Sequence, residues 1–182
     1  MDTASTSQVI HLPIDGILNS IKKTKSFVLG IGTVGDFDPR LVRSVIKDTV
    51  ARFSEKSDRN TILITIRPPN DVCDRHPNGS VNFCEASWSY FEETSAGTKS
   101  WHAQLAELPR WKQEFGLIVF DLGDVCLPMM PRIGRLCDGI AVQMLDPTDS
   151  RETIQALKLL QKNRLTILGA WSIELNSQNR AA

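Results

Sequence analysis

Residues 25–53 read KSFVLGIGTVGDFDPRLVRSVIKDTVARF, and this stretch decides the fold. The apolar run Phe27–Ile31 predicts a buried strand. The apolar residues that recur at helical spacing over Leu41–Phe53 predict a core-facing helix. Pro39 suits the first turn of that helix, with Asp38 as its N-cap. A strand, a glycine-rich turn and a helix in this order are the usual layout of a phosphate-binding loop.

The rest of the chain alternates between strand and helix patterns. The run Thr61–Ile66 is β-branched and uncharged, as expected for a central parallel strand that is covered on both faces. This alternation predicts a three-layer α/β domain, with a mostly parallel sheet of about five or more strands, helices on both faces and right-handed crossovers. We expect further strands at 115–122, 139–144 and 165–171, and helices at 15–23, 100–113, 129–136 and 150–162.

Three segments depart from the alternation. The polar ends, 1–13 and 177–182, predict disordered tails around a single domain at 14–176. Residues 70–97 contain a turn at Asn78-Gly79 and then VNFCEASWSYFEE, which fits either a strand or a loop. In the helix expected at 100–113, Pro109 should bend or shorten the helix.

The composition limits the classes of partner. Lys+Arg and Asp+Glu both number 21, so no net charge attracts the chain to nucleic acid or to an acidic membrane. No apolar stretch approaches the roughly 18 residues that span a bilayer, and the N-terminus lacks a signal-peptide pattern. We expect a cytoplasmic protein. The cysteines form no CxxC pair, which favours reduced thiols over a zinc site at Cys73, His76 and Cys84.

Ligands of a parallel sheet bind beyond the carboxyl ends of its strands. Asp121 closes an apolar strand, where an aspartate either contacts Mg²⁺ or caps a loop. We find no nucleophile paired with a base and expect no catalytic residue. We also expect neither a metal nor a cofactor. The positions that we assign to a degenerate nucleotide site are Gly32, Thr33, Gly35, Asp36, Arg67, Asp121 and Asp124, and Asp146 follows another strand.

The glycines Gly30, Gly32 and Gly35 also match the GxGxxG pattern of dinucleotide-binding folds. That pattern expects an acidic residue at the end of the next strand, whereas this strand ends in Arg67. Arginine suits a 2′-phosphate, so NADP binding stays open as an alternative. Acidic residues at the start of the following helix satisfy its dipole and repel a pyrophosphate, which favours a tight strand-to-helix turn without a ligand.

Residues 115–174, FGLIVFDLGDVCLPMMPRIGRLCDGIAVQMLDPTDSRETIQALKLLQKNRLTILGAWSIE, resemble a known family. The chain is similar to the P-loop domain of bacterial tyrosine kinases of exopolysaccharide synthesis, which are related to the MinD/ParA ATPases. In this resemblance FDLGDV stands for the Walker B strand, and CDGIAVQM and ILGAWSIE for the two following strands. FVLGIGTVGDFDPRLVRSVI aligns with the Walker A loop and its helix, and TILITIRPP with the strand that carries a second aspartate.

The resemblance implies an ATP site, and the residues of this chain depart from it. Asp38 stands where the family has the phosphate-binding lysine, and Pro39 stands where it has the hydroxyl that holds Mg²⁺. Thr65 and Arg67 replace the second-strand aspartates, and Glu174 replaces an asparagine that contacts the base. ATP should therefore not bind in the manner of the family.

These departures predict a catalytically inactive kinase-like domain that works as a binding or regulatory module. The chain has a single tyrosine, Tyr90, whereas the kinases carry a tyrosine-rich tail as their own substrate. By resemblance, its partner would be a protein of exopolysaccharide synthesis or export, such as a membrane-bound polysaccharide co-polymerase. The alternative is an NADP-binding oxidoreductase that uses the GIGTVG loop.

Overall fold

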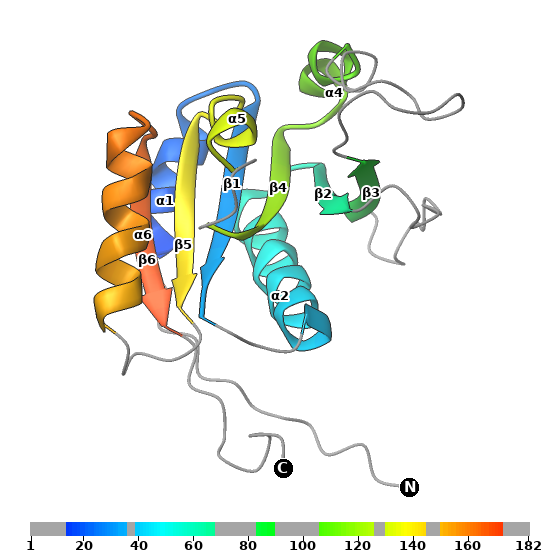
Figure 1. Cartoon of the computed structure of the whole chain (residues 1–182). Helices are drawn as coiled ribbons and strands as arrows, with labels where there is room; N and C mark the ends of the chain where they lie inside the picture. The colour runs from blue at the N-terminus through cyan, green and yellow to red at the C-terminus, as the bar shows by residue number, and fades with distance from the viewer. Residues whose placement is uncertain are drawn as a thin grey trace, which may run out of the picture.

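The structure is a computed structural model, and it describes residues 14–35, 39–67, 83–89, 106–125, 130–144 and 150–172. A six-stranded sheet in the order β3-β2-β4-β1-β5-β6 forms its centre (Figure 1). Every neighbouring pair is parallel, which confirms the expected α/β class. The strands are β1 Phe27–Val34, β2 Thr61–Arg67, β3 Phe83–Ser89, β4 Leu117–Asp124, β5 Gly139–Met144 and β6 Ile167–Ser172.

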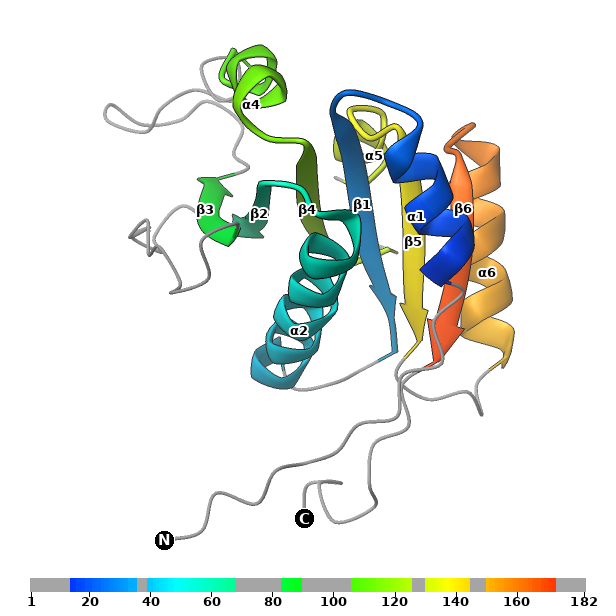
Figure 2. The same ribbon diagram turned by 180° about the vertical axis from the view of Figure 1, so that it is seen from behind.

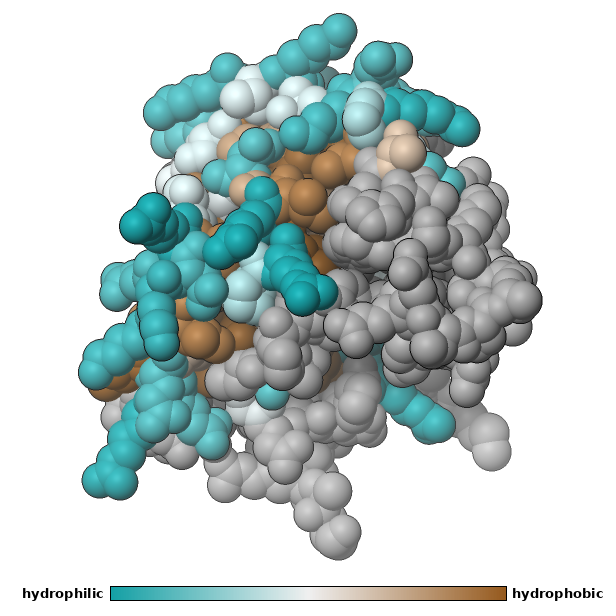
Figure 3. Space-filling view, turned by 45° about the horizontal axis from the view of Figure 1, so that its top comes forward, coloured by the Kyte–Doolittle hydropathy of each residue, from teal (hydrophilic) through white to brown (hydrophobic). Residues whose placement is uncertain are grey.

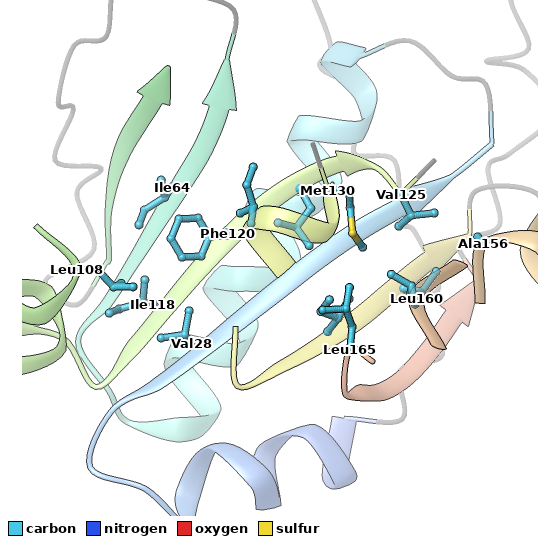
Figure 4. Packing of buried hydrophobic residues seen from close by; sticks show 14 of the residues in the cluster. Val28, Ile64, Leu108, Ile118, Phe120, Val125, Met130, Ala156, Leu160 and Leu165 are labelled. Carbon is cyan, nitrogen blue, oxygen red and sulfur yellow. The ribbon is translucent and has the colours of Figure 1, made fainter. Parts of the chain in front are cut away.

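Helices cover both faces of this sheet, as Figures 1 and 2 show from opposite sides. One face carries α1 and α2, and we call it the α1/α2 face. The other carries α4, α5 and α6, and we call it the α6 face (Figure 4). The helices are α1 Ile14–Lys22, α2 Pro39–Ser57, α4 Leu108–Glu114, α5 Met130–Gly134 and α6 Ser150–Lys162.

The helix periods read from the sequence explain how the α1/α2 face is filled. In α1 the apolar side chains recur at Ile17, Leu18 and Ile21, and all three are buried. In α2 the buried apolar side chains from Val45 to Phe53 follow the same spacing. Both stripes pack on Leu29, Ile31 and their neighbours in β4 and β5 as one apolar cluster.

The α6 face holds the second apolar cluster, and the outer surfaces of its helices are polar. Figure 3 shows hydrophilic side chains that project at the margin of the described surface, with apolar residues visible between them. Among the described residues, Ile154 of α6 is the one large apolar side chain that is exposed, at 48%. None of the described helices is both long and apolar enough to cross a membrane.

Several expected boundaries were wrong. Strand β1 was expected to end at Ile31 and runs to Val34, because Gly32 and Thr33 pair with both β4 and β5. The expected turn at this point is therefore strand. Strand β4 was expected over 115–122 and likewise continues to Asp124, with a register shift at Leu122 that accommodates one extra residue.

The structure decides between the alternatives that the sequence left open for two other segments. The strand-or-loop segment contains β3, which adds a parallel edge to β2. Pro109 shortens the expected helix rather than bending it, since α4 begins at Leu108 and the proline lies in its first turn, where a missing N–H leaves no bond unmade. The expectations for the tails at 1–13 and 177–182, the turn at 78–79 and the helical residues 100–105 lie outside the described residues.

Candidate functional site

The motif GIGTVG is mostly a strand, and its backbone is engaged in the sheet. Gly30 pairs with Phe120 of β4 and with Ile140 of β5, and the pairing with both strands continues through Thr33. In a parallel ladder these contacts use the N–H and C=O groups of the strand. The amides of Gly30 to Thr33 are thus directed to neighbouring strands, whereas a phosphate loop presents its amides to the ligand.

Packing on the α6 face accounts for the first two glycines. A Cβ added at Gly30 would lie 2.7 Å from Cδ1 of Leu122 and 3.0 Å from Sγ of Cys137. A Cβ added at Gly32 would overlap Cγ1 of Val125, which lies over β1 in Figure 4. The two glycines make room for the chain that leaves β4, and this role needs no ligand.

The third glycine has a conformational role. Gly35 has φ 114°, a backbone conformation that residues with a Cβ rarely adopt. It follows the last residue of β1, so the chain turns away from the sheet there. Just before this turn, Val125 N–H donates to the carbonyl oxygen of Thr33 at 3.1 Å, which ties the end of β4 to the end of β1.

Cys137 belongs to the packing around Gly30. Burial raises the pKa of its thiol well above the usual range, and the nearby Asp138 carboxylate raises it further. The thiol stays protonated at neutral pH and has little nucleophilic character. Asp138 itself is held in place, since its Oδ2 accepts the Val28 N–H at 2.8 Å.

The two aspartates of β4 lie at the carboxyl ends of the central strands. Asp121 is 8% exposed, and its Oδ1 accepts the N–H of Gly123 at 3.1 Å. Gly123 has φ 63°, so its backbone bends back toward that carboxylate. Asp121 lies opposite Ile31 on one side and Thr65 on the other, while the exposed Asp124 lies opposite Thr33.

Buried polar side chains gather at this end of the α1/α2 face. Strand register places Thr65 beside Asp121, and Thr33 beside Gln143, which lies in turn beside Trp171. We call this set the polar band: Thr33, Thr65, Asp121, Gln143 and Trp171. On the α6 face the corresponding strand positions are apolar residues or glycines. The carboxyl end of the α1/α2 face is therefore the part of the sheet that is equipped for polar contacts.

The structure unites part of the residue set expected from the sequence. Thr33, Asp121 and Asp124 lie on adjacent strands, and Arg67 ends the neighbouring β2 two residues beyond Thr65. Gly32 points to the other face, against Val125, and Gly35 forms the turn. Asp36, Asp38, Asp146, Tyr90 and Glu174 lie outside the described residues, as do Cys73 and His76.

Gln143 was missed in the sequence. A glutamine within the otherwise apolar strand GIAVQM is a visible anomaly, and it could have marked a polar position on a buried strand. Trp171 at the edge of the sheet is buried as well, at 2% exposed. Its place beside Gln143 depends on strand register, which the sequence does not display.

Solved structures share this fold. The BceF tyrosine kinase domain matches with a TM-score of 0.59 and 12% identity over 87% of this chain and 75% of its own. The chimerical protein CapA2B2 matches with a TM-score of 0.63 and 10% identity, over 88% of this chain and 84% of its own. The kinase domain of the Escherichia coli tyrosine kinase ETK matches with a TM-score of 0.59 and 13% identity, over 91% of this chain and 74% of its own.

No protein-family model and no curated protein matches the sequence. The structural matches show that this chain has the α/β fold of bacterial tyrosine kinase domains, as the sequence resemblance implied. At such low identity the likeness concerns the fold alone.

Proposed function

We propose that this chain is a kinase-like α/β domain without ATP chemistry, which acts in the cytoplasm as a binding or regulatory module. The observation that carries the proposal is the position of Gly30 to Val34 inside β1. Their pairing with neighbouring strands keeps the backbone of this stretch in the sheet, and the first two glycines serve packing.

The residues that follow support the same reading. The sequence has Asp38 where the kinase-like pattern has a lysine. The negative carboxylate of Asp38 would therefore face a phosphate of the same charge. At an effective dielectric constant of about 20, charges 4 Å apart repel by about 4 kcal/mol. Pro39, the first residue of α2, has neither a hydroxyl for Mg²⁺ nor a backbone N–H for a phosphate oxygen.

A thermal-shift titration tests this proposal. The full chain is titrated with Mg²⁺–ATP, Mg²⁺–ADP, NADP⁺ and NAD⁺, with the ETK kinase domain as a positive control for ATP. A ligand at 100 times its Kd would add about 2.7 kcal/mol of stability, a shift of several degrees. We expect no shift of this chain with any of the four. A shift with ATP or ADP would overturn the proposal, and a shift with NADP⁺ alone would establish the dinucleotide alternative.

A double variant tests whether the side chains at 38 and 39 or the backbone of β1 prevent ATP binding. Asp38→Lys combined with Pro39→Thr restores the side chains of the ATP-binding pattern and leaves β1 unchanged. Because the amides of Gly30 to Thr33 remain in the sheet, we expect the double variant still not to bind ATP. If it does bind, the side chains alone abolished binding, and the strand geometry of GIGTV is not the obstacle.

The process in which the module works is exopolysaccharide synthesis or export, with a membrane-bound polysaccharide co-polymerase as its partner. The resemblance of the sequence to kinases of that process supports this part, together with the shared fold. Deletion of the encoding gene should change the amount or length of exported polysaccharide, and the Asp38→Lys/Pro39→Thr variant should complement it as well as the wild type. An unchanged polysaccharide profile on deletion would exclude this role.

A further inference from the structure

Three neighbouring strands carry a row of buried polar groups that have no hydrogen-bond partner among the described residues. Thr33 of β1 lies opposite Gln143 of β5, and Gln143 lies opposite Trp171 of β6. Directly paired residues of adjacent strands project from the same face of a sheet. This row lies on the α1/α2 face, because Trp171 belongs to the apolar cluster of that face together with Ile31 and Ala141.

The row is buried and its hydrogen-bonding capacity is unused within the described chain. Gln143 is 0% exposed, and Thr33 and Trp171 are 4% and 2% exposed. The atoms without a hydrogen-bond partner among the described residues are Thr33 Oγ1, Gln143 Oε1, Gln143 Nε2 and Trp171 Nε1. Together they offer donors and acceptors without any ionisable group.

The spacing of the strands leaves room for a bridging molecule between these groups. Adjacent strands lie about 4.8 Å apart, so paired side chains bond directly only when one leans toward the other, and these side chains do not. The same spacing suits a bridge by one small molecule, since two hydrogen bonds of about 2.8 Å at a bent angle span about 4.8 Å. Water has this size and supplies both donors and acceptors.

Leaving the row dry would be costly. A buried polar group without a partner carries the full cost of its desolvation, and four such atoms in one row would multiply this cost. One bridging molecule can form hydrogen bonds to two of these polar atoms, because the atoms lie on adjacent strands. Native proteins commonly hold internal water at such sites.

We propose that Thr33, Gln143 and Trp171 form an internal site for small uncharged hydrogen-bonding molecules, occupied by ordered water that bridges β1, β5 and β6. The water bridges hold the carboxyl end of edge strand β6 to the centre of the sheet. They do so past the register shift between Ile140 and Ala141, where the β5–β6 pairing is irregular. The site lies on strands next to Asp121 but does not depend on nucleotide binding.

A crystal structure of the full chain at better than about 1.8 Å resolution tests occupancy directly. We expect at least one water within hydrogen-bond distance of the Gln143 amide and of either Thr33 Oγ1 or Trp171 Nε1. Density for a larger molecule, checked by native mass spectrometry of the same sample, would replace water as the occupant and overturn the proposal. A row without density, or with direct side-chain bonds, would overturn it as well.

A matched pair of isosteric variants tests the energetics. Thr33 and Thr49 are both buried with an unpartnered Oγ1, but Thr49 lies on α2 outside the strand row. Thr33→Val removes one arm of a water bridge and should lower the Tm by roughly 3–6 °C. Thr49→Val removes a single orphan and should leave the Tm unchanged or raise it.

The opposite outcome is equally informative. If Thr33→Val raises the Tm as Thr49→Val does, Thr33 Oγ1 is unpaired in the folded protein and the water site does not exist. Gln143→Met provides a second reading, since it keeps the length of the side chain and removes both polar atoms. It should lower the Tm if the amide is bridged, and a higher Tm would contradict the bridge.

Discussion

The two faces of the sheet differ most at the carboxyl end of β1. On the α6 face, Gly30 and Gly32 lie beneath Leu122 and Val125, and side chains fill the space to the backbone. On the α1/α2 face, the same stretch of β1 presents Thr33 to a band of buried polar groups. The glycine pattern is thus explained by packing on the α6 face, and the buried polar groups lie on the α1/α2 face.

The largest expected effect tests the packing role of Gly32. Gly32→Ala places a methyl group on Val125, whose branched side chain has little freedom to move, and should destabilise the protein by about 3 kcal/mol. Urea denaturation followed by circular dichroism gives the change in unfolding free energy. The double variant Gly32→Ala/Val125→Ala should recover part of the loss. Wild-type stability of the single variant would mean that packing does not select this glycine.

The second prediction concerns Gly30, where the obstacle is softer. A methyl group there meets the end of the Leu122 side chain and the thiol of Cys137, both of which can shift by rotation. Gly30→Ala should therefore cost about 1–2 kcal/mol in the same assay, less than Gly32→Ala. The reverse order of the two costs would contradict the ranking of the two contacts.

The third prediction uses the thiol on the α6 face. Its pKa is raised in the folded protein, so above the unfolded pKa of about 8.5 the unfolded chain loses a proton that the folded chain retains. Stability is fully present below that pH and should fall above it by up to about 1.4 kcal/mol per pH unit. Cys137→Ala should remove this slope from the pH dependence of unfolding. Identical slopes in both proteins would mean that the thiol ionises in the fold.

The smallest expected effect lies under the opposite face. Gly16 in α1 is exposed, and an added Cβ has no neighbour within 4 Å. Gly16→Ala should stabilise the protein by about 0.5–1 kcal/mol through helix propensity. A higher urea midpoint checks this sign, which is opposite to that of the two strand glycines. A lower midpoint would show that α1 needs the freedom of a glycine.

The fold was largely predictable because uncharged apolar runs and 3.6-residue periods are local features. Thr61–Ile66 and Ser150–Lys162 were recognised in this way, and the structure has β2 and α6 there. The end of β1 was misjudged because glycines usually indicate turns, whereas the neighbouring side chain of Val125 explains why Gly32 lies inside a strand. Gln143 and Trp171 come together through register between strands, a property that no local pattern reports.

The central position of β1 also has a consequence for how the chain folds. Its two neighbours, β4 and β5, come from residues 117–144, far later in the sequence. During synthesis, both edges of the apolar β1 therefore stay unpaired until most of the chain has been made. Long-range parallel pairing is slow and leaves sticky intermediates exposed. Refolding from urea should accordingly be slow and should lose yield as protein concentration rises, with α1 and α2 shielding one face of β1 in the meantime.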